Sequence, residues 1–231
     1  MSERLSITTP DGAFSAYVAR PAAASAPAVI AIQEIFGVNR VMREVCDRLA
    51  AAGFLAVAPD LFWRLEPGVD ITDQSQAEWD KAFDLMNRFD VDQGVEDIRT
   101  TIDQVRAGPG CSGKVGAVGY CLGGRLAYLT ATRTDADASV GYYGVGIEGY
   151  LAEAERLAHP LMLHIAEEDA FVPKDAQALI ASALKDHPQV TLHSYPGCDH
   201  AFARPGGAHY DAKAAAEADG RTLAFLKQHL G

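Results

Sequence analysis

Several features that mark other classes of protein are absent or scarce in this sequence. The longest apolar runs, such as Ala26 to Ile32 and Phe54 to Ala58, are far shorter than the roughly 20 residues that a membrane-spanning helix needs. The N-terminus has no basic stretch followed by an apolar core, which is the pattern of a secretory signal. We therefore expect a cytoplasmic protein that does not contact a membrane.

Cysteine and clustered histidine are also scarce. The four cysteines in 231 residues include no C-x-x-C pair, so they do not form a disulfide framework, and we expect reduced thiols. The seven histidines are scattered, and none lies in an H-E-x-x-H arrangement or a comparable ligand spacing. The sequence therefore predicts no metal site.

Positive charge is the third scarcity. The 20 lysines and arginines face 31 aspartates and glutamates, which gives a formal net charge of -11. Such a surface repels the phosphates of nucleic acids and anionic lipids, so a small molecule is the expected partner. An anionic substrate would need a local basic patch to overcome this field.

The hydrophobic pattern predicts one α/β domain over residues 1–231, with a doubly wound, mostly parallel sheet and helices on both faces. Residues 5–18 alternate around Asp11-Gly12 and predict an antiparallel hairpin. Residues 59–90 are a long excursion of mixed polarity. The remaining predicted strands are 28–32, 54–58, 114–119, 138–143, 161–165 and 190–195, and the predicted helices are 39–52, 77–87, 91–107, 122–132, 174–185 and 212–229.

The most specific local signal is Gly119-Tyr120-Cys121-Leu122-Gly123, at the turn from a predicted strand into a predicted helix. This pattern matches a nucleophile elbow in which cysteine replaces serine, because the flanking glycines let the chain pass close to its neighbours. A helix N-terminus favours a thiolate and offers amides to an oxyanion. The alternative is a buried structural cysteine beside packing glycines.

Folds that carry a nucleophile elbow place the nucleophile first in the chain, then the acid, then the histidine. Two segments after Cys121 fit this order. Asp169 lies in a carboxylate loop after the strand 161–165, where Glu167 and Glu168 are alternative acids. His200 lies in a loop after the strand 190–195. The order predicts that Asp169 orients His200, which acts as the base for Cys121. This mechanism needs no cofactor.

Five segments together resemble the dienelactone hydrolase (carboxymethylenebutenolidase) family over nearly the whole chain. They are Gln33-Glu34-Ile35-Phe36-Gly37, Gly119-Tyr120-Cys121-Leu122-Gly123-Gly124, Tyr142-Tyr143-Gly144-Val145-Gly146, Asp169-Ala170-Phe171-Val172-Pro173 and His200-Ala201-Phe202-Ala203-Arg204. The resemblance implies an α/β-hydrolase fold, a monomer, and the opening of an enol-lactone ring, as in chlorocatechol breakdown. It also implies a triad of Cys121, Asp169 and His200.

The resemblance further implies that Glu34 hydrogen-bonds the resting thiol and helps to deprotonate it. A carboxylate at the end of a buried strand suits a proton acceptor, whereas the alternative is that Glu34 caps the next helix. The fold predicts an oxyanion hole made of the backbone N–H groups of Leu122 and Ile35.

Members of this family that act on dienelactone bind its carboxylate with two arginines. Arg204 matches one of them, whereas the position of the other falls on Trp79 in an ungapped alignment. This departure puts dienelactone itself in doubt, although Arg64 or Arg88 would substitute if the excursion folds differently. Trp79 and Phe36 would instead form an aromatic wall of the pocket, or would simply pack in the hydrophobic core. Tyr143 is taken as a further substrate contact.

Three other residues are expected in the core without a catalytic role: Cys46, Cys198 and His164. Two rival functions remain open. The first is a carboxylesterase or thioesterase of the same fold with a less anionic substrate, which Trp79 favours. The second is a non-catalytic ligand-binding relative.

Overall fold

The N-terminal hairpin forms where the Asp11-Gly12 turn signal places it. A computed structural model describes residues 3–231, in which β1 (Glu3–Thr9) pairs antiparallel with β2 (Gly12–Ala19). Phe14, Ala16 and Val18 alternate along β2 and are buried, so the period of two is that of a half-covered strand. The predicted hairpin is confirmed.

All strands lie in one eight-stranded sheet with the order β1-β2-β4-β3-β5-β6-β7-β8. The pairings of β1 with β2 and of β2 with β4 are antiparallel, and the others are parallel. The predicted, mostly parallel α/β sheet is confirmed. The other strands are β3 (Ala26–Ile32), β4 (Leu55–Pro59), β5 (Cys111–Tyr120), β6 (Ala138–Tyr142), β7 (Leu161–Ala166) and β8 (Val190–Tyr195).

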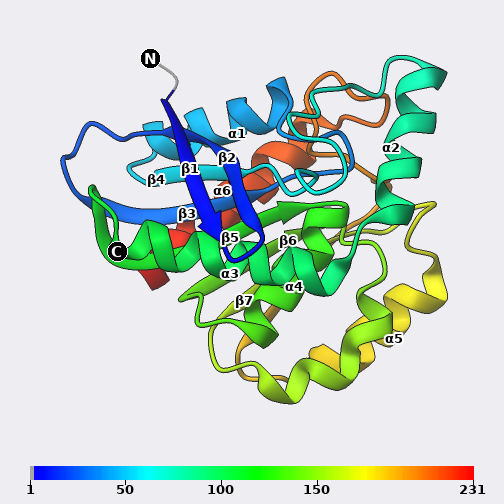
Figure 1. Cartoon of the computed structure of the whole chain (residues 1–231). Helices are drawn as coiled ribbons and strands as arrows, with labels where there is room; N and C mark the ends of the chain where they lie inside the picture. Colours follow the sequence, from blue (N-terminus) through cyan, green and yellow to red (C-terminus); the bar gives the residue numbers. More distant parts are fainter. Residues whose placement is uncertain (1–2) are drawn as a thin grey trace.

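Helices cover both faces of the sheet, as the alternation predicted (Figure 1). α1 and α6 lie on the face to which Val118, Tyr120 and Tyr142 point, and α3 and α4 lie on the other. The helices are α1 (Arg40–Ala51), α2 (Gln76–Arg88), α3 (Val91–Ala107), α4 (Leu122–Arg133), α5 (Lys174–Leu184) and α6 (Ala212–Leu230). A 3₁₀ helix, η1 (Ile147–Arg156), was not predicted.

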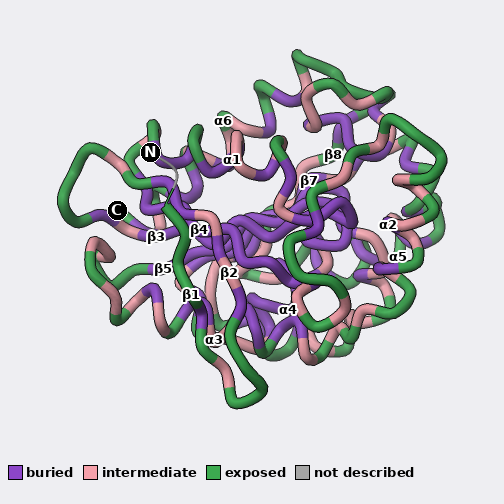
Figure 2. The backbone as a smooth tube through the Cα atoms, turned by 45° about the horizontal axis from the view of Figure 1, so that its top comes forward, coloured by how far each residue is buried: buried purple, intermediate pink, exposed green. Residues whose placement is uncertain are grey.

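The buried residues concentrate along the sheet and the inner sides of the helices (Figure 2). Every residue of β4 and β6 is buried, because helices cover the sheet on both sides. No helix within residues 3–231 is long and apolar enough to cross a membrane. The same residues contain no group of three or more histidine, cysteine, aspartate or glutamate side chains that could hold a metal ion.

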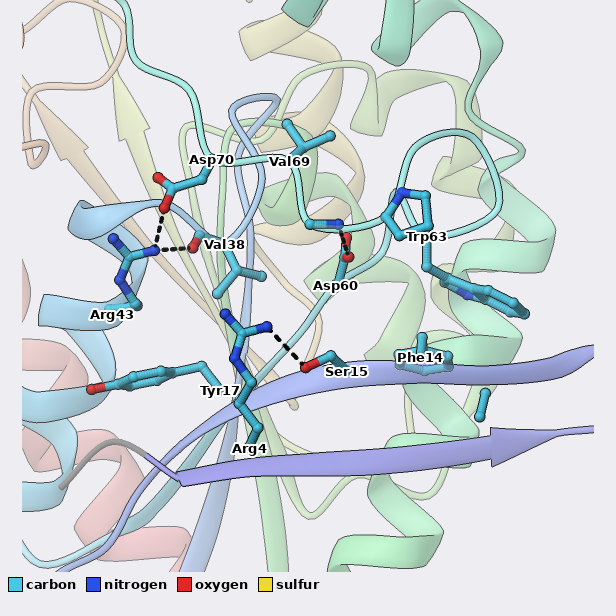
Figure 3. A pocket seen from close by; sticks show the side chains of 13 residues that line it. Arg4, Phe14, Ser15, Tyr17, Val38, Arg43, Asp60, Trp63, Val69 and Asp70 are labelled. Carbon is cyan, nitrogen blue, oxygen red and sulfur yellow. Dashed lines mark hydrogen bonds and ion pairs between the residues drawn. The ribbon is translucent and has the colours of Figure 1, made fainter.

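The excursion that follows β4 is tied to the loop that follows β3. Gly37 and Asp70 form an isolated bridge, and the Nδ2 of Asn39 donates to the carbonyl of Ile71 at 2.9 Å. Figure 3 shows the hollow of about 300 Å³ between this excursion and the hairpin, where Arg43 pairs with Asp70 at 2.7 Å. The excursion is therefore a fixed part of the structure around the ends of the parallel strands.

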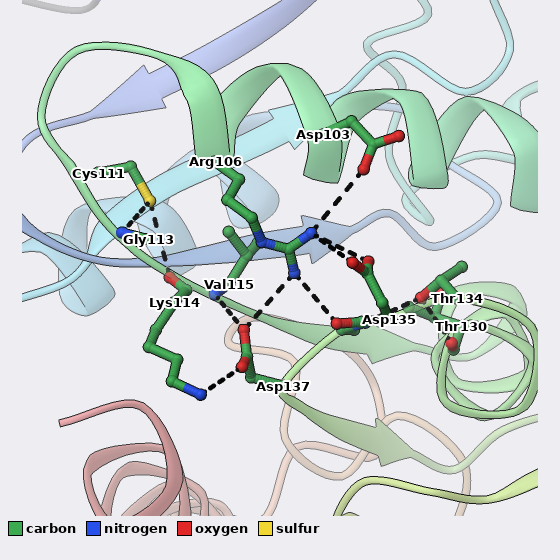
Figure 4. Close-up of polar contacts among 11 residues, drawn as sticks. Asp103, Arg106, Cys111, Gly113, Lys114, Val115, Thr130, Thr134, Asp135 and Asp137 are labelled. Atoms are coloured by element: carbon green, nitrogen blue, oxygen red, sulfur yellow. Dashed lines mark hydrogen bonds and ion pairs between the residues drawn. The ribbon is translucent and has the colours of Figure 1, made fainter.

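A cluster of ion pairs holds the opposite end of β5 and β6 (Figure 4). Arg106 near the end of α3 contacts both carboxylate oxygens of Asp135 at 3.0 and 2.9 Å. Asp137 accepts from the backbone N–H of Val115 at 2.9 Å and pairs with Lys114 at 2.6 Å. These contacts fix the start of two central strands far from Cys121.

Candidate active site

Cys121 lies on the turn between β5 and α4, in a backbone conformation that glycines make accessible. Its φ of 58° and ψ of -116° are unusual for a residue other than glycine. A Cβ atom at Gly119 would lie 1.9 Å from the carbonyl oxygen of Gly123, and one at Gly123 would lie 2.4 Å from that of Ile32. Both glycines are therefore required for the close approach that holds the thiol at this turn.

The carboxylate loop and the histidine loop meet beside Cys121. The Nδ1 of His200 lies 2.8 Å from Oδ2 of Asp169, and both side chains are buried. The other oxygen of Asp169 accepts the backbone N–H groups of Phe171 and Val172 at 2.8 and 3.2 Å. All three predicted members of the triad thus converge at the carboxyl ends of β5, β7 and β8.

The alternative acids of this loop point elsewhere. Glu168 is exposed and pairs with Lys174 at 3.2 Å. The backbone carbonyl of Glu167 accepts from the Nε2 of Gln177 at 3.1 Å, and no hydrogen bond joins its carboxylate to His200 within residues 3–231. Asp169 is therefore the carboxylate that contacts the histidine.

His200 is poised to hold a proton. Burial by itself lowers its pKa, but the charge interaction with Cys121 and the hydrogen bond to Asp169 raise the pKa to about 10. Its backbone is also fixed, because its N–H donates to Oδ1 of Asp199 at 2.6 Å. A protonated imidazole places a positive charge beside the sulfur of Cys121.

Glu34 at the end of β3 is buried and pairs with Arg204. The Nη1 of Arg204 lies 3.2 Å from Oε2 of Glu34, and its Nη2 lies 3.1 Å from Oδ2 of Asp73. Among the described residues, Oε1 of Glu34 has no hydrogen-bond partner. Glu34 does not cap the next helix, because the side chain of Asn39 accepts from the N–H of Met42 at the start of α1.

A cavity of about 30 Å³ lies in front of Cys121 and His200, large enough for a water molecule or two. Its wall is mainly aromatic: the ring of Trp79 stands edge-on to Phe36 at 5.1 Å and stacks on Phe83 at 5.5 Å. Both predicted aromatic residues, Phe36 and Trp79, thus line the cavity rather than only the core. Its complete lining is Ile35, Phe36, Trp79, Phe83, Met86, Cys121, Val145, Phe171, His200 and Arg204.

Four of these lining residues were not singled out from the sequence: Phe83, Met86, Val145 and Phe171. Trp79, Phe83 and Met86 recur at helical spacing along α2, so this apolar stripe was a readable signal in the excursion. Phe171 is 45% exposed, and its ring centre lies 4.8 Å from that of His200. Asp73, which holds Arg204, gave no signal of its own in the sequence.

The two arginines suggested as replacements for Trp79 lie away from the cavity. Arg64 contacts Asp97 and pairs with Asp11 at 2.8 Å beside the hairpin. Arg88 pairs with Asp84 on the exposed side of α2 at 2.8 Å. Within residues 3–231, Arg204 is therefore the one arginine that lines the cavity.

Tyr143 lies behind His200 instead of in the cavity lining. Its ring centre is 5.1 Å from that of His200, and the side chain is almost completely buried. Its φ of 37° follows from the sharp turn after β6, where its N–H donates to the carbonyl of His164 at 2.8 Å. Burial raises the pKa of its hydroxyl well above 10. This position fits support of the imidazole ring better than contact with a substrate.

The two predicted oxyanion donors belong to segments next to Cys121: Leu122 follows it in the chain, and Ile35 lines the same cavity. Leu122 is the first residue of α4, so its N–H has no carbonyl in a preceding turn to bind. Ile35 lines the cavity from the loop after β3. Their role as an oxyanion hole stays a prediction.

The three residues assigned to the core are buried, as predicted. His164 is satisfied by the hydroxyl of Tyr195 at 2.8 Å and that of Thr222 at 2.9 Å. Cys46 and Cys198 are buried free thiols. Burial raises the pKa of both, so neither is a competing nucleophile at neutral pH.

Known proteins share this site-bearing fold over the full chain. A family model described as "Dienelactone hydrolase family" matches residues 14–230. The chain belongs to the dienelactone hydrolase family. It is 54% identical to a "Putative carboxymethylenebutenolidase" of Azospirillum brasilense, with 96% of each protein covered. It is 42% identical to the carboxymethylenebutenolidase of Pseudomonas putida, over 98% of this chain and 96% of that protein.

The dienelactone hydrolase fold also appears in the structural comparison. A crystal structure titled "Putative Dienelactone Hydrolase", from Klebsiella pneumoniae, has a TM-score of 0.86 and 29% identity, and covers 99% of this chain and 98% of that one. The α/β-hydrolase fold is thereby confirmed. Membership of the family makes this protein a hydrolase that acts on an ester or lactone, so the non-catalytic alternative is set aside.

Proposed function

We propose that this protein hydrolyses a small enol-lactone or ester through a triad of Cys121, His200 and Asp169. The observation that carries the proposal is the contact of His200 with Asp169 at 2.8 Å, beside a cysteine held on a strained turn at a helix N-terminus. Each of these features alone occurs in structural sites. Their convergence on one small cavity is the arrangement that nucleophilic catalysis requires.

The chemistry proceeds in two halves. The thiolate of Cys121 attacks the carbonyl carbon, and the N–H groups of Leu122 and Ile35 hold the oxyanion that forms. Collapse of this intermediate breaks the carbon–oxygen bond, and the leaving oxygen takes a proton from the imidazolium of His200. Water then gives a proton to His200 while its oxygen attacks the thioester carbon. Collapse of this second intermediate breaks the carbon–sulfur bond, releases the acid and restores the thiolate of Cys121 beside the imidazolium of His200.

Glu34 is proposed to act on the resting thiol, as the family resemblance implies. Support comes from its position at the end of β3 and from its Oε1 atom, which has no hydrogen-bond partner among residues 3–231. A buried carboxylate oxygen without a partner is available to accept a hydrogen bond or a proton. Its other oxygen is held by Arg204 at 3.2 Å, which fixes its direction.

The test is turnover of a dienelactone and of simple activated esters by the wild type and Cys121→Ala, with mass spectrometry for an acyl adduct. We expect turnover of at least one of these substrates and a trapped adduct in the wild type, and neither in the variant. Activity that survives the substitution would overturn the nucleophile. Turnover of dienelactone would extend to this chain the activity named for its relatives in Pseudomonas putida and Azospirillum brasilense.

A second candidate is a carboxylesterase or thioesterase of the same family with a less anionic substrate. Trp79 favours it, because an indole in the cavity wall cannot pair with a carboxylate. Turnover of esters without dienelactone would keep the triad and select this candidate. In either case we propose a cytoplasmic monomer with no nucleic acid or membrane partner.

A further inference from the structure

Two of the three nitrogens of the Arg204 guanidinium already face carboxylates inside the protein. Its Nη1 pairs with Glu34 at 3.2 Å and its Nη2 with Asp73 at 3.1 Å, while the group lies over the ring of Phe36 at 5.1 Å. The side chains of Arg204, Glu34 and Asp73 are 10%, 4% and 11% exposed. Two carboxylates thus face one guanidinium where solvent hardly reaches.

Asp73 is held in place by its surroundings. The N–H and hydroxyl of Thr72 donate to Oε1 of Glu78 at 2.8 and 2.9 Å, which closes the turn that leads into α2. The indole N–H of Trp79 donates to the backbone carbonyl of Asp73 at 3.0 Å. Ser75 caps α2 through the N–H of Glu78. The carboxylate of Asp73 is therefore presented to Arg204 by a capped helix start.

The charges around the cavity add to a negative total. Glu34, Asp73 and Asp169 are three carboxylates close to the cavity, against the single guanidinium of Arg204 and the one positive charge of His200 when it holds its proton. The cavity wall itself is aromatic or aliphatic apart from Cys121, His200 and Arg204. A substrate carboxylate that reached Arg204 would have to displace Glu34 or Asp73, and would meet their repulsion.

We propose that Asp73 is a specificity-determining residue that occupies Arg204 and selects against substrates that carry a carboxylate. The substrate class of the site is then uncharged apolar or aromatic esters and lactones. This inference rests on the proposed function, because it concerns the substrates of the same cavity. It assigns to Asp73 an effect on which substrate binds, without a part in bond making or breaking.

A second hollow explains how removal of Asp73 would change the surroundings of Arg204. A groove of about 310 Å³ lies beside the pair, and Arg204 and Phe36 line both this groove and the cavity in front of Cys121. Asp73 lines only the groove. Loss of its charge therefore frees Nη2 of Arg204 for a substrate carboxylate that occupies the groove.

The experiment compares two esters that share a leaving group, the para-nitrophenyl monoester of glutaric acid and para-nitrophenyl hexanoate, with spontaneous hydrolysis subtracted. The wild type is expected to prefer the hexanoate by kcat/KM by about tenfold or more. Asp73→Asn is expected to raise the glutarate-to-hexanoate ratio about tenfold through a lower KM for the glutarate ester. Asp80→Asn is the matched control.

Asp80 is an exposed carboxylate on α2 that accepts from Gln76 at 2.7 Å and does not line the cavity. Asp80→Asn removes a charge of the same sign from the same part of the chain, so its glutarate-to-hexanoate ratio of kcat/KM should equal that of the wild type. An unchanged ratio in Asp73→Asn, or an equal loss on both esters, would overturn the inference and leave Asp73 a structural residue. If the variant does not fold, a wild type that accepts both esters equally refutes the inference, and one that strongly prefers the hexanoate supports it.

Failure of the proposed function has a separate signature. It shows as hexanoate turnover that persists in Cys121→Ala, or as no turnover of either ester. In the second case, calorimetric titration with glutarate decides about Asp73. The inference requires binding to Asp73→Asn and at least tenfold weaker binding to the wild type, and equal binding to both would refute it.

Discussion

The contact between Asp169 and His200 can be removed while the loop around it is kept. In Asp169→Asn, the amide oxygen can still accept the N–H groups of Phe171 and Val172, which lie 2.8 and 3.2 Å from Oδ1. The amide nitrogen then faces Nδ1 of His200 as a donor. Because two donors cannot bond, the neutral imidazole must carry its proton on the other nitrogen, where it cannot accept one from the thiol.

The size of the effect follows from the two terms that act on His200. Burial lowers its pKa, and the interactions with Cys121 and Asp169 overcome burial to raise it to about 10. Without the charge of Asp169, burial is opposed less and the pKa falls, so the imidazolium that supports the thiolate is lost. We expect kcat/KM to fall between about 10²-fold and 10⁴-fold, or about 3 to 5 kcal/mol of transition-state stabilisation.

Two measurements separate this reasoning from simple misfolding. The first is kcat/KM for an activated ester, and the second is the rate at which iodoacetamide alkylates Cys121 between about pH 5 and pH 9. The wild-type rate is expected to be higher than that of Asp169→Asn over this range, because His200 keeps its proton, and with it a positive charge beside the sulfur, up to a pKa of about 10. In Asp169→Asn the fast reaction should require higher pH.

Glu168→Gln is the control, since it removes an exposed carboxylate of the same loop that pairs with Lys174 at 3.2 Å. It should keep both the turnover and the alkylation profile of the wild type. The reasoning is refuted if Asp169→Asn retains the wild-type alkylation profile, or if the control loses as much activity as the variant.

Three further predictions concern stability. Gly123→Ala places a Cβ 2.4 Å from a backbone oxygen and should cost about 2 to 4 kcal/mol in urea unfolding, whereas Gly220→Ala, which meets nothing within 4 Å in α6, should stabilise by about 0.5 to 1 kcal/mol. Burial lowers the pKa of His164 well below 6.5, so at low pH the unfolded chain takes up a proton that the folded chain does not. As the pH falls below about 6.5, the free energy of unfolding should therefore drop by up to about 1.4 kcal/mol per pH unit. His164→Gln should remove this contribution to the pH dependence. Arg106→Ala breaks the contacts with Asp135 and should lower the free energy of unfolding by about 1 to 2 kcal/mol in thermal unfolding. Its kcat/KM should equal that of the wild type, because the cluster lies at the end of β5 away from Cys121. A change in kcat/KM would contradict this placement.

The parallel sheet was predictable because its central strands are continuous runs of apolar residues in the sequence. β3 and β4 are covered on both faces, and their boundaries follow the prediction within two residues. The start of β5 at Cys111, three residues early, was not predictable, because residues 111–114 carry no apolar period of their own and pairing with β3 extends the strand there. The 3₁₀ helix η1 was missed although Ile147, Tyr150, Leu151 and Ala154 recur at helical spacing.

The convergence of Cys121, Asp169 and His200 was predictable from chain order, since Cys121, the carboxylate loop and the histidine loop each follow a strand. The surroundings of Arg204 were not. Asp73 reaches it from a segment 131 residues earlier in the chain, as the ion pair shows, and no local pattern announces such a meeting. The same holds for Phe171, whose place beside the imidazole depends on how two loops fold together.

The two halves of the site are supplied by separate parts of the chain. The nucleophile turn depends on backbone packing among β3, β5 and α4, whereas the opposite aromatic wall is a stripe of Trp79, Phe83 and Met86 on α2. Side chains on that stripe are only partly buried, so they can be exchanged without opening the sheet core. Natural selection or laboratory evolution can therefore reshape substrate preference by acting on one peripheral helix, while the machinery for bond cleavage is inherited intact.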